Sequence, residues 1–342
     1  MSERAPTFGL FLNMGANLAS TPEGVFDLTR RQARAADELG YHDLWVTEHH
    51  FIRFGLNPSP FAAAGFLLGM TERVRVGTAV VLSPLHHHVA VAEQASLLDQ
   101  FSAGRFDLGV GRGGYVRDYD VYGIDTAAWD PEPELTLDAV LALWRGGPVH
   151  AAEPDVGIQP PVRAAGRPGL FVASSTEAAV KRAAVEGLAL QHYFAVPVDG
   201  RVELEHRYRD AGGDPDAGHV HTLIVIVTDG DGTADRDRLR AALTQSLRDG
   251  DHPGVPNQAD RHVGPDGQPL DRATMAEFVA AGAIVGPPSR VVDELGAFVD
   301  ATGARRLVLY PESIGDASLT MGSIERFAAE VAPQLVGSRP TR

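Results

Sequence analysis

The residues best suited to chemistry stand together at Glu48, His49 and His50, directly after an apolar run at 43–47. Imidazole gains and loses protons near neutral pH, and an adjacent carboxylate can tune that step. Neighbouring residues of an extended chain point to opposite sides, so His49 and His50 are not expected to bind one zinc ion together. The cluster indicates an acid/base or ligand role. The alternative is a structural role, in which the three side chains only form local hydrogen bonds at the end of a strand.

A second group of side chains is suited to holding a phosphate. Residues 109–114 read Gly-Val-Gly-Arg-Gly-Gly, in which the glycines allow close backbone approach and Arg112 can grip an anion. Ser174, Ser175 and Thr176 follow the next apolar run and open a helix, where hydroxyl and free N–H groups bind anions. Glycine-rich turns with an arginine are common, and Ser and Thr are ordinary helix caps. On neighbouring strands the two features together predict a site for one phosphate.

Three further segments favour structural interpretations. The triple His86-His87-His88 begins a helix and lacks ligand spacing, so a structural role is favoured over a functional one. The small-residue stretch at 61–68 predicts a tightly packed helix, or a face that meets a partner subunit. The segment 249–271 contains eight Gly or Pro residues and two histidines without an apolar period, which is typical of a lid or a disordered excursion.

Composition narrows the classes of function. The 342 residues carry a net charge of −15, which argues against nucleic acid or an anionic membrane as the main partner. The absence of cysteine excludes disulfides, thiolate nucleophiles and cysteine-ligated metals. The start of the sequence lacks a signal-peptide pattern, and no apolar run approaches the ~20 residues of a transmembrane helix. We therefore expect a cytoplasmic protein.

The elements that must position these residues alternate between short apolar runs and longer amphipathic ones. Eight runs are predicted as strands: 7–12, 43–47, 74–82, 105–109, 169–173, 189–194, 222–227 and 306–310. Helices are predicted between them, for example at 24–39, 89–101, 134–144, 176–186, 235–247 and 289–301. This alternation predicts an α/β fold, a (β/α)₈ TIM barrel formed by one domain over 1–342, with function at the carboxyl ends of the strands. An open doubly wound parallel sheet is the alternative.

Several stretches, taken together, resemble the bacterial-luciferase-like flavin-dependent monooxygenase family. They are 44–51 (LWVTEHHF), 54–56 with Pro58, 76–82 (VGTAVVL), 93–100 (EQASLLDQ), 104–106 (GRF), 111–113 (GRG), 285–288 (VGPP) and 300–303 (DATG). The resemblance covers nearly the whole chain and is weakest between about residues 199 and 271. It implies a TIM barrel that binds reduced FMN, supplied by a separate flavin reductase, at its carboxyl face. Dioxygen would form a flavin hydroperoxide that oxygenates a small organic substrate, here a secondary metabolite.

The resemblance also implies roles for individual residues. His49 matches the catalytic histidine, and Glu48 would lie near the isoalloxazine ring. The stretch Gln191-His192-Tyr193 would lie beside that ring, with His192 expected to bind the flavin. The phosphate would be held by Arg112, Ser174, Ser175 and Thr176, in agreement with the phosphate site expected from the residues themselves. A non-proline cis peptide is expected between Ala79 and Val80, next to the flavin. A homodimer is expected through helices at about 61–71 and 89–100.

The sequence departs from the family pattern at four places. Gly111 stands where luciferases have a reactive cysteine, and His88 where a proline is usual. No Lys or Arg lies between Asp118 and Trp144, where the family often has a second basic phosphate contact. The region of the family's mobile loop differs in length and composition. Neither thiol chemistry, nor a long-chain aldehyde substrate, nor light emission therefore follows from the resemblance.

Three other functions compete with the oxygenase. In a deazaflavin-dependent oxidoreductase of the same fold, the Glu-His-His triplet at 48–50 would not be expected. A non-catalytic flavin-binding protein would have lost part of the barrel, whereas eight strands are predicted here. A metal-dependent barrel hydrolase is poorly supported, because we find no His-x-His at the end of a predicted strand, and no metal is expected.

Overall fold

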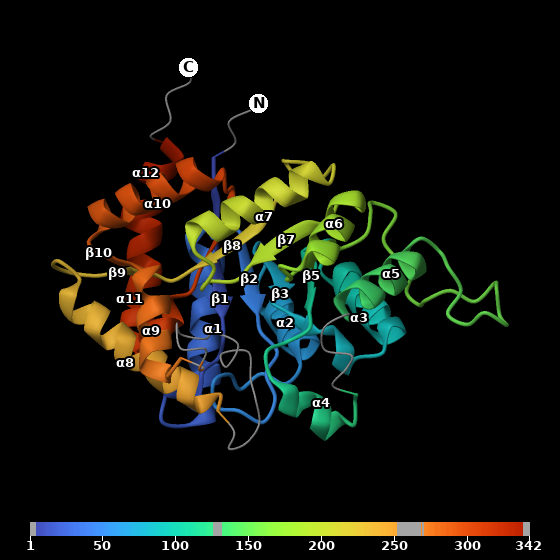
Figure 1. The fold of residues 1–342 in the computed structure, drawn as a ribbon, viewed down its shortest axis with the longest axis horizontal. Coiled ribbons are helices and arrows are strands. Elements are labelled where there is room, and N and C mark those ends of the chain that lie inside the picture. The colour runs from blue at the N-terminus through green and yellow to red at the C-terminus, as the bar shows by residue number, and fades with distance from the viewer. Residues whose placement is uncertain (1–4, 126–131, 252–267, 269, 338–342) are drawn as a thin grey trace.

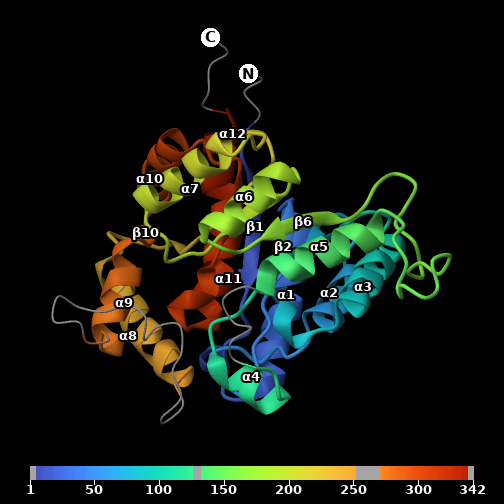
Figure 2. The same ribbon diagram turned by 45° about the vertical axis from the view of Figure 1, so that its right-hand side comes forward.

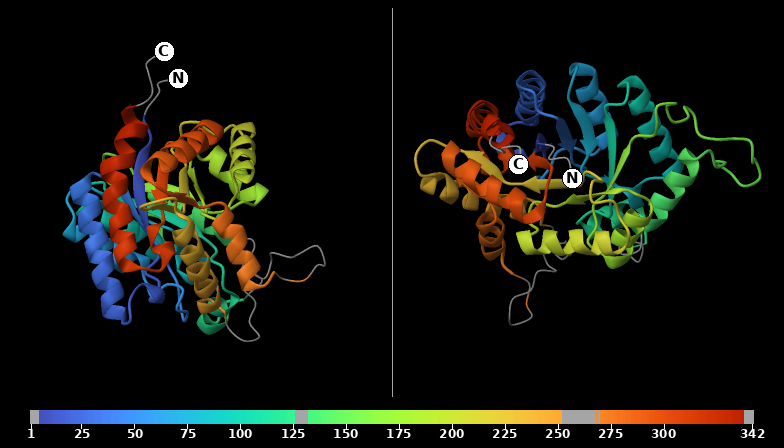
Figure 3. Two further views of the ribbon diagram at one scale, coloured as in Figure 1. Left: turned by 90° about the vertical axis from the view of Figure 1, so that its left-hand side faces the viewer. Right: turned by 90° about the horizontal axis from the view of Figure 1, so that it is seen from above.

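The computed structural model describes residues 5–125, 132–251, 268 and 270–337. Its main sheet runs in the order β3-β2-β1-β11-β8-β7-β6-β5-β4, and β3 also pairs with β5, which closes the ring. Every pairing in the sheet is parallel. β4 continues β3, so eight strand positions form a closed barrel, and helices surround it when it is viewed from above (Figure 3). The predicted TIM barrel is confirmed, and the open sheet is excluded.

The strands agree closely with the apolar runs of the sequence. They are β1 (Thr7–Leu12), β2 (Asp43–Val46), β3 (Arg75–Thr78), β4 (Val81–Leu82), β5 (Phe106–Gly111), β6 (Gly169–Val172), β7 (Ala189–His192), β8 (Val220–Leu223), β9 (Val225–Val227), β10 (Ile284–Gly286) and β11 (Arg306–Leu309). The predicted strand 222–227 is split, since β8 belongs to the barrel and β9 pairs with β10 outside it. The three-residue β10 was not predicted, because so short a run shows no period.

The helices connect successive strands and cover the barrel. They are α1 (Pro22–Leu39), α2 (Pro60–Met70), α3 (His88–Phe101), α4 (Val116–Tyr122), α5 (Glu132–Trp144), α6 (Glu177–Val185), α7 (Val198–Asp210), α8 (Thr233–Asp249), α9 (Arg272–Ala281), α10 (Pro288–Thr302), α11 (Ala317–Arg326) and α12 (Ala332–Gly337). In α1 the Thr21 side chain accepts from the Gly24 amide, Pro22 takes the first turn, and Gly40 ends the helix at φ 81°. Most of the segment 249–271 lies outside the described residues. None of the described helices is long and apolar enough to cross a membrane.

The amino end of the barrel is filled by an ion-pair network, here called the plug, that consists of Asp43, Trp45, Arg75, Asp107 and Arg306. Arg306 donates to Asp43 at 2.6 Å and to Asp107 at 2.7 Å, and the Trp45 indole donates to Asp43 at 2.8 Å. Arg75 also donates to Asp107, at 3.0 Å. These residues lie at or near the first positions of β11, β2, β5 and β3, so they close the amino end of the barrel.

Glycines on the inner faces of three strands make room for this network. A Cβ on Gly9 would lie 1.8 Å from the Asp43 carboxylate, and one on Gly77 would lie 2.5 Å from the Trp45 ring. A Cβ on Gly169 would lie 2.4 Å from the Asp107 carboxylate. The plug and its glycines therefore occupy the amino half of the barrel interior. At the opposite end of the barrel, away from the chain termini, lie α4 and the lower end of α8 (Figures 1 and 2).

The plug predicts a large stability cost for losing its cation. Burial would raise the pKa of Asp43, but the positive charge of Arg306 and the contact with His42 bring it down to about 2. Arg306→Leu leaves two buried carboxylates without that cation, and we expect a loss of about 3–5 kcal/mol in the free energy of unfolding. Urea denaturation measures it. The control Arg207→Leu breaks an exposed pair with Glu203 and should cost less than about 1 kcal/mol; equal losses would contradict the role of the plug.

Candidate active site

His49 lies at the carboxyl end of β2 and faces the loop that follows β1. Its Nε2 is 3.1 Å from Asn13 Oδ1, and its ring packs edge-on against Phe54 and Tyr115 at centroid distances of 5.0 and 6.0 Å. Asn13 Nδ2 donates to the Phe54 carbonyl at 2.6 Å, which fixes the amide orientation and leaves Oδ1 as the acceptor. The proton of neutral His49 therefore sits on Nε2, and Nδ1 is its accepting nitrogen. A Cβ on Gly55 would lie 2.4 Å from the ring, so glycine is required there.

The protonation state of His49 follows from its surroundings. Burial lowers the pKa of His49 to about 4, with the charge of Glu48 opposing the shift and that of His50 adding to it. The imidazole is therefore neutral at physiological pH and able to accept a proton.

Glu48 is buried at the centre of a second hydrogen-bond group. Its Oε1 accepts from His50 Nε2 at 2.9 Å and from His86 Nε2 at 2.7 Å, and its Oε2 accepts from the Leu82 amide at 2.8 Å. Burial alone would raise the pKa of Glu48, but these hydrogen bonds outweigh it and hold the pKa below its ordinary value. His50 thus points away from Asn13 and toward Glu48, opposite to His49, as expected from strand alternation.

Two residues that interact with Glu48, one by a hydrogen bond and one through its charge, were not predicted from the sequence. For His86, as for the other two residues of the histidine triple, a structural role was favoured over a functional one, yet His86 contacts Glu48 directly. Asp118 of α4 is buried, and neither of its carboxylate oxygens has a hydrogen-bond partner among the described residues. Burial raises the pKa of Asp118 to about 7, with Glu48 adding to the shift and His50 opposing it. The only sequence signal for Asp118 was its place shortly after the glycine-rich turn.

The predicted phosphate residues are brought together by β5 and β6. The two strands pair in parallel up to Val110 and Val172, so Arg112 and Ser174 follow neighbouring strand ends. Thr176 caps α6, accepting from the Ala179 amide at 3.3 Å, and its hydroxyl lies 3.2 Å from that of Ser174. Ser175 is exposed between them. Three hydroxyls and a helix N-terminus thus follow β6 and Arg112 follows the neighbouring β5, and these groups are of the types that bind a phosphate monoester.

Ala79 stands where β3 gives way to β4, and the expected cis peptide between Ala79 and Val80 is present. The Ala79 amide donates to the Val46 carbonyl at 2.7 Å. A Cβ on Gly111 would lie 3.0 Å from the Val80 side chain, so the Gly111 position is close-packed against this turn. The turn thus lies between the His49 and Arg112 ends of the candidate site.

His192 is placed differently from the other residues expected to bind the flavin. Its Nε2 lies 2.8 Å from Glu205 of α7, on the outer side of β7. The preceding residue, Gln191, takes the inner side, where a Cβ on Gly109 would lie 2.6 Å from its side-chain oxygen. The structure therefore does not bring the His192 side chain together with Arg112 and His49, and strand alternation assigns the inner position to Gln191 instead.

A closed parallel barrel with a partly buried histidine and a group of hydroxyls at its carboxyl end has the architecture of a TIM-barrel enzyme. The family model described as luciferase-like monooxygenase matches residues 7–306. The chain belongs to this family, a group of flavin-dependent oxidoreductases, and the resemblance found in the sequence is confirmed.

Individual relatives agree with this assignment. The alkanal monooxygenase alpha chain of Photobacterium leiognathi is 26% identical over 325 residues, covering 88% of this chain and 91% of that protein. The 4-hydroxyprotoasukamycin monooxygenase of Streptomyces nodosus subsp. asukaensis is 30% identical over 360 residues, covering 97% and 93%. The crystal structure of the monooxygenase RslO1 from Streptomyces bottropensis superposes with a TM-score of 0.77, covering 96% and 99% of the chains. Its 24% identity supports the fold alone.

The unpartnered carboxyl of Asp118 predicts a pH-dependent stability. In the unfolded chain this group ionises near pH 4, whereas in the folded protein it keeps its proton to about pH 7. The folded state binds the extra proton between these values, so this contribution to stability falls as pH rises through that window. Asp118→Asn removes it, and the variant should gain roughly 2–4 kcal/mol over the parent between pH 4 and pH 8.

Urea unfolding at a series of pH values measures the difference. The control Asp120→Asn changes an exposed carboxylate on the same helix and should leave the curve of the parent unchanged. A constant offset between Asp118→Asn and the parent across this pH range would refute a protonated Asp118.

Proposed function

We propose that the protein is the oxygenase component of a two-component system that uses reduced FMN and dioxygen to oxygenate a small organic molecule, a secondary metabolite. The observation that carries this proposal is the neutral His49 at the same barrel end as the Arg112 and Ser174–Thr176 donor set. Family membership and the similarity over 97% of this chain to the 4-hydroxyprotoasukamycin monooxygenase support it. The separate reductase is proposed because the sequence shows no nicotinamide-binding motif.

Each residue of the candidate site has a defined task in this proposal. Arg112, Ser174, Ser175 and Thr176 bind the FMN phosphate, and the turn at Ala79 supports the ring. Bound reduced FMN supplies the electrons that activate dioxygen. His49 accepts a proton at Nδ1 while Nε2–H stays on Asn13, so the ring is oriented before it takes the proton.

Glu48 acts on His49 from the neighbouring position. Its carboxylate is ionised and held by His50, His86 and the Leu82 amide, so its negative charge stabilises the imidazolium that forms when His49 accepts a proton. His192 is left out of the flavin site, because its side chain lies on the other side of the barrel wall.

We also propose that the chain is one cytoplasmic barrel domain that forms a homodimer through α2 and α3. These helices expose apolar side chains: Phe66 is 57% exposed, Leu97 is 42% and Phe101 is 81%. Gly69 on α2 has open space beside it and allows close approach of another helix, whereas a Cβ on Gly65 would lie 3.2 Å from Leu98 of α3. Clustered apolar side chains of this size are the kind of surface that partner subunits cover.

The phosphate assignment is tested by comparing two flavins. Arg112→Ala should weaken binding of reduced FMN by about 1.5–3 kcal/mol, roughly ten- to a hundredfold, because a charged hydrogen bond is lost. Binding of reduced riboflavin, which lacks the phosphate, should change little. Anaerobic fluorescence titration measures both, and Lys181→Ala, an exposed cation on α6, is the matched control. An equal loss for the two flavins would place Arg112 away from the phosphate.

The function itself is tested at His49. His49→Ala should slow product formation by roughly 10²–10⁴-fold, the usual contribution of a positioned acid/base group. Reduced FMN should still bind within a few-fold, because the phosphate donors are unchanged. Oxygen uptake should continue with release of hydrogen peroxide in place of product. The assay supplies FMN through a flavin reductase and follows peroxide and the gain of one oxygen atom by mass spectrometry on cyclic ketone and phenolic surrogates.

Two outcomes would overturn the assignment. Turnover of the parent with reduced deazaflavin and not with reduced FMN would favour the hydride-transfer alternative. Normal coupling in His49→Ala, with coupling lost in His50→Ala, would show that the other histidine of the pair carries the reaction.

A further inference from the structure

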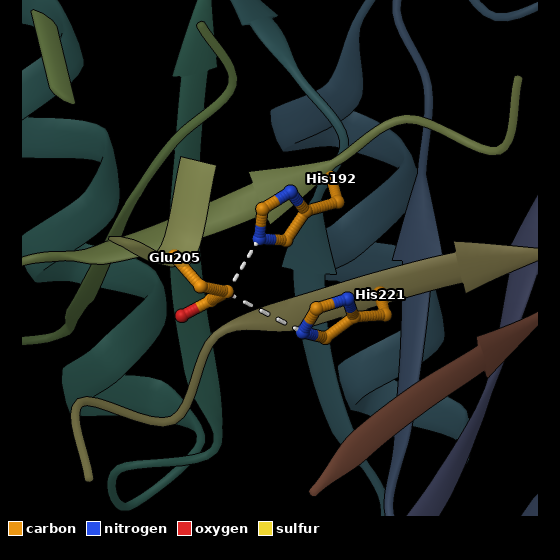
Figure 4. Close-up of side chains that lie close together, drawn as sticks. All are labelled: His192, Glu205 and His221. Atoms are coloured by element: carbon orange, nitrogen blue, oxygen red, sulfur yellow. Dashed lines mark hydrogen bonds and ion pairs between the residues drawn. The ribbon is translucent and has the colours of Figure 1, made fainter. Parts of the chain in front are cut away.

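A buried polar cluster lies on the outer side of the barrel wall, away from the candidate active site. His192 ends β7, His221 lies in β8, and the two are register neighbours in the sheet. Glu205 projects toward both from α7, as Figure 4 shows. The side chains of His192, His221 and Glu205 are 1%, 2% and 12% exposed. Nothing in the proposed oxygenation reaction uses this cluster.

One carboxylate oxygen faces both imidazoles. Glu205 Oε1 is 2.8 Å from His192 Nε2 and 3.6 Å from His221 Nε2, and the ligand atoms of the three residues all lie within 4.8 Å of one another. The His221 contact is too long for a hydrogen bond. Its other nitrogen, Nδ1, is buried, and no described residue makes a hydrogen bond with it. His221 is therefore a buried imidazole that points at the cluster and forms no hydrogen bond with the residues that the structure describes.

A third histidine lies beside the other carboxylate oxygen. His219 Nδ1 accepts from the Leu190 amide at 2.7 Å, so the proton of the neutral ring sits on Nε2. That nitrogen lies 3.3 Å from Glu205 Oε2. No hydrogen bond joins His219 Nε2 to a described residue, so this ring stands next to the carboxylate without holding it, while Oε1 is directed at His192 and His221. Ligating carboxylates in metal sites typically accept a hydrogen bond from a neighbouring donor, and His219 is the nearest candidate for that role.

We propose that His192, His221 and Glu205 bind one divalent transition-metal ion of the zinc class, through the two Nε2 atoms and Oε1. Two imidazoles and a carboxylate suit zinc, whereas calcium and magnesium prefer oxygen ligands alone. The ion joins β7, β8 and α7, so it acts as a structural clamp on the barrel wall.

Ion binding must reorient the two imidazole rings. They now stack at a centroid distance of 4.3 Å with 19° between their planes. A nitrogen lone pair lies in the plane of its ring, so both rings tilt toward a common point when the ion binds. The proton on each ligating ring then resides on Nδ1.

The sequence contains a signal for this site that the search at carboxyl strand ends did not find. His219-Val220-His221 is a His-x-His pattern at the amino end of β8, where strand alternation directs both histidines to the same side. The predicted strand began at residue 222, directly after this pattern.

The test uses the whole protein, freed of metal with EDTA and dialysed. Zinc titration by calorimetry should show one ion per chain with submicromolar affinity, and zinc should raise the melting temperature by several degrees. Cobalt(II) should give the visible absorption of a low-coordinate nitrogen and oxygen site. Glu205→Gln and His221→Gln should each weaken zinc binding at least a hundredfold, and His219→Gln should weaken it less.

The matched control is His206→Gln, which changes the exposed neighbour of Glu205 on α7 and should bind zinc like the parent. Circular dichroism checks that each variant folds. If a ligand variant does not fold, the cobalt spectrum of the parent still decides. Absence of that spectrum, zinc affinity weaker than micromolar in the parent, or equal losses in His206→Gln and Glu205→Gln would overturn the proposal.

Discussion

The fold depends on one buried cation. Arg306 sits between Asp43 and Asp107 at the amino end of the barrel, where an unpaired charge would be strongly unfavourable. Its partners come from strands far apart in sequence, so the ion pairs form only when the ring of strands is closed in this register. The glycines that face Asp43, Trp45 and Asp107 provide the space that the plug requires, because a Cβ at any of them would overlap with its side chains. With the amino half filled in this way, side chains at the carboxyl end are left for chemistry.

A second buried charge organises that carboxyl end. Glu48 joins its own loop to the Leu82 amide of β4 and to the histidines at 50 and 86, and His50 reaches α4 through the Tyr122 hydroxyl at 3.3 Å. His49 is held between this network on one side and Asn13 on the other. Burial lowers the pKa of His49 and keeps the ring neutral, whereas the hydrogen bonds to Glu48 overcome the same effect and keep its pKa below the ordinary value. The protonation states of Glu48 and His49 at this end of the barrel thus depend on how the two side chains are packed and hydrogen-bonded, and not on the residue types alone.

The sequence predicted what depends on periodicity and on strand ends. The eight apolar runs defined the barrel, and alternation correctly directed His49 and His50 to opposite sides. Arg112 and Ser174–Thr176 were placed together because they follow neighbouring parallel strands. Contacts between distant loops were not predictable in this way. His86 reaches Glu48 across two loops, and Asp118 lies on a seven-residue helix whose burial no local pattern reveals.

Residue 192 shows that placing a single side chain on one side of a strand depends on the exact register of that strand. The run 189–194 was identified as a strand, but placing a flavin contact on it requires knowing which alternate side chains face inward. Gln191 fills the inner side against Gly109, so His192 must face α7, where Glu205 receives it. A shift of one residue would exchange these two environments and leave Glu205 facing an amide. Side chains on the inner side of the β7 wall face the proposed flavin site, and those on its outer side face the proposed metal clamp. The two proposed sites therefore share the backbone of β7 but no ligand residue.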